Sequence, residues 1–241
     1  MGGTDVVVEA FTELAPRYEE TVDRELWQYF GVRYRDFIRR LLEIVPCLDG
    51  GVVLDLATGT AGIPLAMVEQ RAQGGPIIGL DVTPAMLSRG HADVESRNLG
   101  SWIRLVCASA TGMPFVKGLF DVVICGLAMH HMDVPAVLYE TRRVLKPGGY
   151  LVVAAVRKPS LWQSPVAKVL LWIAALVYGL LHRTARAKAE MAAIPNLRTA
   201  DEWLAILSDS GFPEVELMTT FPSRRPWYPG AVVLRASTSR A

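Results

Sequence analysis

Two acidic residues stand at or near the ends of apolar runs, where they could hold a nucleoside. Asp55 lies in VLDLATGTAG (53–62), four residues before the first of two glycines, and Asp81 lies near the end of IIGLDV (77–82). A carboxylate this close to a glycine turn repels phosphate but suits a cationic group, and glycines let a ligand approach the backbone. A carboxylate after a strand can accept both hydroxyls of a ribose. The pair therefore indicates a nucleoside that carries a positive centre.

The usual phosphate-binding motifs do not match this glycine turn. A Walker-type loop has a lysine directly after its last glycine, and no lysine follows Gly62 closely. The dinucleotide pattern G-x-G-x-x-G differs in spacing from the observed Gly59-Thr60-Ala61-Gly62. Both interpretations are rejected for this stretch.

Two adjacent histidines supply a second candidate chemistry. His130 and His131 follow the apolar run 121–126, and an imidazole there could deprotonate a phenol or hydroxyl near neutral pH. The alternative is that one of them only hydrogen-bonds to a cofactor or to the backbone; as a base, His131 is preferred. The stretch HHMD offers no compelling tetrahedral ligand set, so no metal site is predicted. Asp133 is expected to cap the next helix.

Short apolar runs alternate with helical patterns between residues 51 and 156, and these elements must position the candidate side chains. Helical patterns occupy 62–72 and 135–149, the latter ending in a Pro-Gly-Gly turn, and another helix begins at Pro84 after the potential cap Thr83. Continuous apolar strands separated by helices favour a parallel sheet covered on both faces. The strands are expected at 52–56, 77–82, 103–107, 121–126 and 150–156.

The C-terminal part differs, and an apolar insertion precedes it. An amphipathic helix (201–212) and two strands (215–221 and 231–237) are expected there. Before them, residues 157–197 contain a run of 13 uncharged residues, too short for a membrane span of about 20. Three interpretations stay open: a cap over a pocket, a helix (165–182) against a membrane surface or apolar partner, and a dimer interface or core packing. A cap would imply a large apolar ligand.

The composition limits the class of protein. With 241 residues, 51% of them hydrophobic, the chain suits one domain, and its net charge of +1 gives no field that would attract nucleic acid. Cys107 and Cys125 lie in apolar runs, and together with Cys47 they make an odd number, which favours buried free thiols. Residues 1–20 contain no basic region followed by an apolar one, so no secretory signal is predicted and a cytoplasmic location is expected. Both a monomer and a homodimer remain open.

Four stretches together resemble one known family. VLDLATGTAG (53–62), GLDVTPAML (79–87), GMPF (112–115) and the segment 120–149, which ends in RVLKPGG, follow one another over roughly half the chain. This set resembles the class I S-adenosylmethionine-dependent methyltransferases, especially the small-molecule branch that includes the ubiquinone and menaquinone C-methyltransferases.

The resemblance implies a fold and a division of the chain. The fold is α/β: a doubly wound, mostly parallel seven-stranded sheet of order 3-2-1-4-5-7-6, with strand 7 antiparallel and a helical cap inserted between strands 5 and 6. A single methyltransferase domain (1–241) would comprise an N-terminal helical lid (1–50), a cofactor-binding core (51–156), the apolar cap (157–197) and a C-terminal helix with a strand pair (198–241).

The resemblance also implies S-adenosyl-L-methionine as cofactor and a set of residues around it. Asp81 would bind the ribose, Met86 would lie near the adenine, and Tyr18 near the methionine moiety, unless Tyr18 only packs in its helix. Ser109 replaces an acid that commonly reaches the adenine amino group, and a hydroxyl can still accept there. Ala57 replaces a common glycine and is expected to fit without difficulty. The complete expected set is Tyr18, Asp55, Ala57, Thr58, Gly59, Asp81, Val82, Met86, Ser109, Ala110, Gly126 and Leu127.

The expected function is transfer of a methyl group to carbon or oxygen of an apolar small molecule, such as a quinone, polyketide or lipid-like acceptor. The alternative is a cyclase, isomerase or binding protein that uses the same cofactor without methyl transfer. Nucleic-acid methylation is not favoured, because CGLAMHH (125–131) contains no NPPY-like tetrapeptide.

Overall fold

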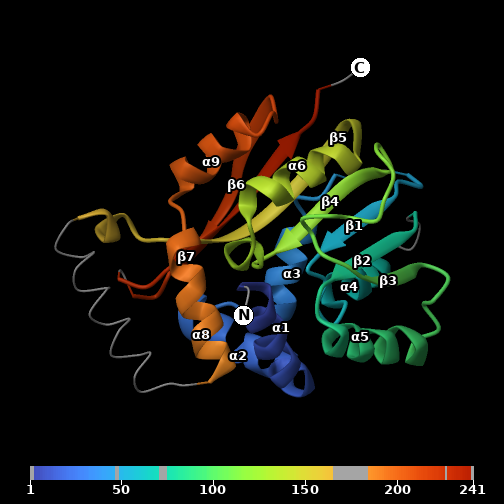
Figure 1. The fold of residues 1–241 in the computed structure, drawn as a ribbon, viewed down its shortest axis with the longest axis horizontal. Helices are drawn as coiled ribbons and strands as arrows, with labels where there is room; N and C mark the ends of the chain where they lie inside the picture. The colour runs from blue at the N-terminus through green and yellow to red at the C-terminus, as the bar shows by residue number, and fades with distance from the viewer. Residues whose placement is uncertain (1–2, 47–48, 71–74, 165–183, 226, 240–241) are drawn as a thin grey trace.

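The computed structural model describes residues 3–46, 49–70, 75–164, 184–225 and 227–239. Within them, seven strands form one sheet of order β3-β2-β1-β4-β5-β7-β6 (Figure 1). Strands β1 to β5 are parallel, and β7 runs antiparallel to both β5 and β6. The predicted fold class and strand order are therefore confirmed. The strands are β1 (Val53–Leu56), β2 (Ile77–Asp81), β3 (Ile103–Cys107), β4 (Phe120–Gly126), β5 (Leu145–Arg157), β6 (Glu214–Phe221) and β7 (Gly230–Ser237).

Helices cover both faces of the sheet, as its apolar strands require. Val123 of β4 packs with α6 and α9 in a cluster that includes Trp203, whereas its neighbour Val122 packs on the opposite face with α3 and α4 around Phe37. Successive strand residues point to opposite faces, so a strand that is apolar at every position needs two covering layers. These helices are α3 (Tyr34–Leu42), α4 (Gly62–Gln70), α6 (Val134–Val144) and α9 (Ala200–Asp209), and α5 (Pro84–Ser96) contacts β2 and β3.

Two N-terminal helices and one helix of the insertion lie together beyond the sheet (Figure 1). They are α1 (Gly3–Leu14), α2 (Tyr18–Phe30) and α8 (Ala185–Ala193). The short turns of the described residues are η1 (Ala15–Arg17), η2 (Met129–His131), η3 (Ser160–Gln163) and η4 (Ile194–Asn196). Helix α1 packs on α8 through the buried Ala10, Ala185 and Ala189. These small side chains allow the two helix backbones to approach closely.

The structure corrects three expectations about individual elements. The helix after β4 ends at Val144, and residues 145–149 belong to β5, because Leu145 already pairs with Phe120. Cys107 is exposed rather than buried, since β3 is an edge strand, while Cys125 is buried and free as predicted. Thr83 precedes α5 without any side-chain cap.

Other expectations hold, or lie outside the described residues. Asp133 caps α6 by accepting a hydrogen bond from the backbone N–H of Ala136 (3.2 Å). Cys47 and residues 165–183, which contain the apolar run, are not described. Among the described helices, none is long and apolar enough to cross a membrane.

Candidate active site

A cavity of about 940 Å³ opens where β1, β2 and β4 end, beneath α1, α2 and α8. Both histidines and all but one of the expected cofactor residues line it; the exception is Asp55. Apolar side chains from the surrounding helices form much of its wall: Phe11, Leu14, Leu26, Phe30, Ile38 and Met191. Tyr228 and Trp162 also reach it. One cavity thus joins the two groups of residues that the sequence singled out separately.

Asp81 is the buried carboxylate that faces this cavity from the end of β2. Its Oδ2 accepts a hydrogen bond from the backbone N–H of Gly59 (2.9 Å), and its Oδ1 accepts one from that of Thr83 (2.8 Å). Burial raises the pKa of Asp81, while these two hydrogen bonds favour its ionised form. Each carboxylate oxygen keeps acceptor capacity for a ligand, because it has two lone pairs. The side chain is therefore suited to bind a pair of ribose hydroxyls.

Asp55 lies on β1, fully buried and outside the cavity wall. Neither of its carboxylate oxygens, nor the hydroxyl of the adjacent Thr58, has a hydrogen-bond partner of good geometry among the described residues. Burial raises the pKa of Asp55 to about 7; the nearby hydroxyl of Thr58 acts against this, and the carboxylate of Asp81 acts in the same direction as burial. A buried carboxylate without partners is costly unless it is protonated or a positive group lies near it. This is consistent with a cationic ligand close to β1.

The glycine turn after β1 has a left-handed backbone at alternate positions. Ala57 has φ +54°, Gly59 φ +57° and Ala61 φ +64°. The expectation that Ala57 fits without difficulty was wrong, because its Cβ is crowded in this conformation, which glycine adopts freely. A Cβ at Gly59 would lie 3.0 Å from Cε of Met86. The turn is thus packed tightly between the two strand ends.

Two tyrosines from the N-terminal helices close over this turn. Tyr18 lies within 4 Å of the position of a Gly59 Cβ, and the Tyr34 hydroxyl lies 2.6 Å from where a Gly62 Cβ would stand. Burial, together with the charges of Asp81 and Asp55, raises the pKa of Tyr18. Both phenols line the cavity as neutral hydrogen-bonding groups. Tyr34 was not predicted, because its glycine contact depends on how α3 packs.

Ser109 and Ala110 follow β3 and line the cavity beside Asp81. The Ser109 hydroxyl lies 2.8 Å from that of Thr111, and it also accepts a hydrogen bond from the Thr111 backbone N–H (3.2 Å). The hydroxyl pair offers both a donor and an acceptor at the place where the family commonly has an acid.

The histidine pair lies in the turn η2 after β4 and lines the same cavity. The two rings lie with their centroids 4.1 Å apart, and Phe11 of α1 packs edge-on against His131 (5.5 Å). Burial lowers the pKa of His130 well below its usual value, and His131 acts in the same direction. Burial, with the charge of Arg186, lowers the pKa of His131 to about 4. Both imidazoles are therefore neutral at pH 7.

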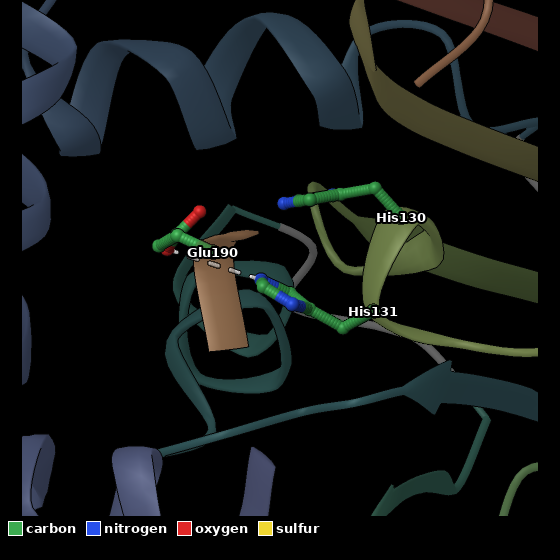
Figure 2. Close-up of side chains that lie close together, drawn as sticks. All are labelled: His130, His131 and Glu190. Carbon is green, nitrogen blue, oxygen red and sulfur yellow. Dashed lines mark ion pairs between the residues drawn. The ribbon is translucent and has the colours of Figure 1, made fainter. Parts of the chain in front are cut away.

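Glu190 of α8 completes a polar cluster with these histidines (Figure 2). Its Oε1 lies 4.0 Å from Nε2 of His131, and one ligand atom from each of the three residues lies within 4.8 Å of the others. Sequence analysis missed Glu190, since nothing in EMAAIPN (190–196) indicates that α8 docks beside η2. The three groups have the chemistry of metal ligands, although no metal site was predicted.

The residues at the Asp81 end fit S-adenosylmethionine. Asp81 has acceptor capacity for the ribose, Ser109 and Met86 line the same cavity, and the buried carboxylate of Asp55 suits a positively charged ligand.

Comparison with known proteins agrees with this fit. The methyltransferase domain family matches residues 54–153. The chain is 37% identical over 144 residues to a demethylmenaquinone methyltransferase of Thermus thermophilus, which covers 59% of this chain and 62% of that protein. It is 28% identical over 207 residues to a ubiquinone/menaquinone biosynthesis C-methyltransferase of Geobacter sulfurreducens, covering 85% of this chain and 79% of that protein.

Four demethylmenaquinone methyltransferases, the Thermus protein among them, are matched over only 54 to 64% of their own length. The crystal structure of a [4+2]-cyclase superposes with a TM-score of 0.64 at 17% identity, covering 86% of this chain and 81% of the cyclase. At that identity the likeness shows a common fold, and a fold can carry different reactions.

Proposed function

The chain belongs to the class I S-adenosylmethionine-dependent methyltransferases through residues 54–153, and on this premise we propose that it methylates a large, apolar, hydroxyl-bearing small molecule. The observation that carries the proposal is that Asp81 and His131 line one and the same cavity. The class of acceptor follows from the apolar wall between them. The names of the relatives in Thermus and Geobacter point to a quinone-type acceptor.

The cofactor end of the cavity would be formed by the expected residues. Asp81 would accept hydrogen bonds from the ribose hydroxyls, Met86 and Ser109 would border the adenine, and Tyr18 would cover the methionine moiety. When bound, S-adenosylmethionine supplies a methyl group activated by its sulfonium. The surrounding protein contributes chiefly by orienting the partners and excluding water, and orientation alone can supply several kcal/mol of a barrier, about 7–11 kcal/mol in the best cases.

The histidine end would act on the acceptor. A neutral imidazole can take a proton from a phenolic hydroxyl, which makes the oxygen and its conjugated ring carbons better nucleophiles. We assign this role to His131, and His130 would border the acceptor beside it. The low polarity of the surrounding wall would keep water away from the reacting groups.

The test is product formation from a defined acceptor. The protein would be incubated with S-adenosylmethionine and a short-chain 2-prenyl-1,4-naphthoquinol, and both S-adenosylhomocysteine and the methylated quinol would be measured by mass spectrometry. Equal amounts of the two products are expected. Tight binding of the cofactor without either product, across prenylated quinols and phenols, would contradict methyl transfer and favour a non-methylating enzyme on this fold.

A further inference from the structure

Three large apolar side chains are exposed on neighbouring segments beside the cavity. Leu161 of η3 is 62% exposed, Trp227 in the loop between β6 and β7 is 61% exposed, and Trp27 of α2 is 44% exposed. A single exposed apolar side chain is common on a folded protein, whereas a group of them marks a surface that contacts another molecule. We refer to these three side chains, with the neighbouring Arg224 and Arg225, as the loop patch.

Direct contacts hold the three segments of the loop patch together. The indole N–H of Trp162, on η3, donates a hydrogen bond to the backbone carbonyl of Trp227 (3.1 Å), and Figure 1 shows η3 and this loop on the same side of the molecule. The ring of Tyr228 stacks on that of Tyr29 near the end of α2, with the centroids 5.2 Å apart. The backbone N–H of Arg224 donates to the carbonyl of Tyr29 (2.8 Å). The three segments therefore form one continuous surface.

The loop patch and the cavity wall are two sides of the same segments. Trp162 and Tyr228 line the cavity, whereas Leu161 and Trp227, their neighbours in the chain, are exposed. Tyr29, which stacks on Tyr228, lines the cavity too. Exposed apolar side chains thus stand directly beside a cavity whose own wall is largely apolar.

Arginines without carboxylate partners surround these apolar side chains. Arg224 and Arg225 are exposed, as is Arg40, whose guanidinium lies 5.8 Å from the centre of the ring at the end of β6. None of the three takes part in an ion pair among the described residues. Asp23, on the same helix as the exposed indole of α2, is already paired with Arg33 (2.8 Å). The loop patch is therefore basic, although the whole chain has a net charge of only +1.

Two of these arginines are held against aromatic rings. The guanidinium of Arg224 lies 4.7 Å from the centre of the Trp27 ring, and that of Arg225 lies 5.7 Å from the centre of the Tyr228 ring. Gly31 ends α2 with φ +69°, and a Cβ there would lie 2.8 Å from Nε of Arg224. The close approach of Arg224 to α2 thus depends on a glycine. A guanidinium can donate two parallel hydrogen bonds to a phosphate, so these arginines suit a phosphate-bearing partner.

We propose that the loop patch docks on a membrane surface that contains anionic phospholipids, and that the apolar acceptor passes from the lipid into the cavity there. Aromatic side chains are favoured at the interface between headgroups and acyl chains, and arginines close to that interface are attracted by anionic lipids. A second copy of the chain, packed patch to patch, would bring like charges together, whereas anionic headgroups neutralise them. The passage of the acceptor rests on the proposed function; the docking does not.

A first experiment measures docking without turnover. Flotation of the protein with vesicles of phosphatidylcholine alone is compared with flotation on vesicles that contain equal amounts of phosphatidylcholine and phosphatidylglycerol. We expect binding to the mixed vesicles that weakens as salt is added, since salt screens exposed charges. Replacement of both arginines, Arg224→Gln with Arg225→Gln, should weaken this binding by about 30-fold, or about fivefold for each charge. Trp227→Ala should weaken it by about tenfold, because its ring no longer leaves water.

The opposite edge of the sheet supplies matched controls. Strand β3 is the edge strand farthest in the sheet order from β6, and it offers an exposed arginine, Arg104, and, directly before it, the 41% exposed Trp102. Arg104→Gln and Trp102→Ala should leave vesicle binding unchanged. Thermal unfolding of all variants shows whether they are folded. Equal binding of wild type and loop-patch variants, or equal losses in loop-patch and control variants, would overturn the docking.

A second experiment tests the passage of the acceptor. A long-chain prenylated naphthoquinol would be supplied within the mixed vesicles, and its methylation compared with that of the short-chain quinol in solution. The double arginine variant should lower kcat/KM for the long-chain quinol by about 30-fold and leave that for the short-chain quinol unchanged. Equal losses for both quinols would contradict delivery from the membrane.

The outcomes separate this inference from the proposed function. Vesicle binding that depends on the loop patch, without any methylated quinol, supports the docking and contradicts the proposed acceptor. Methylation of the short-chain quinol without any vesicle binding supports the proposed function and overturns the docking. A dimer that Trp227→Ala dissociates in analytical ultracentrifugation, with no vesicle binding, would overturn it too and assign the loop patch to an interface between two copies of the chain.

Discussion

The carboxylate of Asp81 accepts a hydrogen bond from the backbone N–H of Gly59, with an Oδ2–N distance of 2.9 Å. This contact joins the end of β2 to the glycine turn after β1, so the two acidic motifs of the sequence act as one structural unit. The same carboxylate faces the cavity. Its position therefore depends on the conformation of the turn, and the first two predictions concern this unit.

Asp81→Asn is expected to weaken binding of S-adenosylhomocysteine by about 10²-fold. The ribose hydroxyls would lose a charged acceptor, and the amide nitrogen cannot accept the hydrogen bond of either Gly59 or Thr83. Isothermal titration calorimetry measures the effect, with Asp93→Asn on α5 as a control. An unchanged dissociation constant would show that the nucleoside binds elsewhere.

Ala57→Gly is expected to stabilise the protein, by about 0.5–1 kcal/mol. Glycine removes the crowding of Cβ at φ +54°, although it also makes the unfolded chain more flexible. Ala205→Gly, at an exposed position within α9, should have the opposite effect, a loss of roughly 1 kcal/mol. Urea unfolding compares the two variants. If both variants are destabilised alike, the backbone of Ala57 is not left-handed in solution.

Asp55→Asn is expected to stabilise the ligand-free protein at pH 8. The pKa of Asp55 rises from 3.8 in the unfolded chain to about 7 in the fold, so the folded state binds the extra proton between these values. The stability of the wild type should therefore fall as the pH rises from about 4 to 7, and stay low above 7. The uncharged amide avoids this loss.

The gain from Asp55→Asn should reach about 2–4 kcal/mol at pH 8 and shrink towards pH 4. Urea unfolding at both pH values measures it, and the exposed Glu95→Gln should show no such pH-dependent gain. An equal gain at both pH values would mean that ionisation of Asp55 is not the cause.

His131→Asn is expected to lower kcat by about 10²–10⁴-fold, the usual contribution of a general base. Affinity for S-adenosylhomocysteine should change little if His131 acts on the acceptor, because the ribose acceptor Asp81 is kept. Steady-state kinetics with the naphthoquinol, together with calorimetry, separates the two effects, and His91→Gln on α5 is the control. Equal losses in turnover and cofactor affinity would assign His131 to binding instead.

The sequence predicted the strands of the parallel sheet well, because each short apolar run between two helical patterns is typical of a buried strand. The run at 103–107 became β3 at the predicted residues, and the run at 121–126 became β4 with one added residue. The start of β5 was missed, since the Pro-Gly-Gly at 147–149 is typical of a turn, and here pairing with Phe120 extends it. Tertiary pairing overrode the local signal.

The sequence predicted the site residues that lie in short local motifs, but not those that tertiary packing brings to the site. Asp81 ends β2 and His131 lies in the turn after β4, and the parallel sheet brings both to one edge. Glu190 could not be found, because its place depends on how α8 packs against α1 and η2. Asp55 was expected to contact the ligand; it is fully buried and does not line the cavity, and its role toward a ligand stays a prediction.

The central claim is that one cavity holds the cofactor and the acceptor, and a crystal structure with S-adenosylhomocysteine tests it most directly. We predict the ribose hydroxyls within hydrogen-bond distance of Asp81, and the sulfur facing the apolar space that ends at His131 and Glu190. A nucleoside bound away from Asp81, or a sulfur facing a closed wall with no space towards His131, would contradict the account.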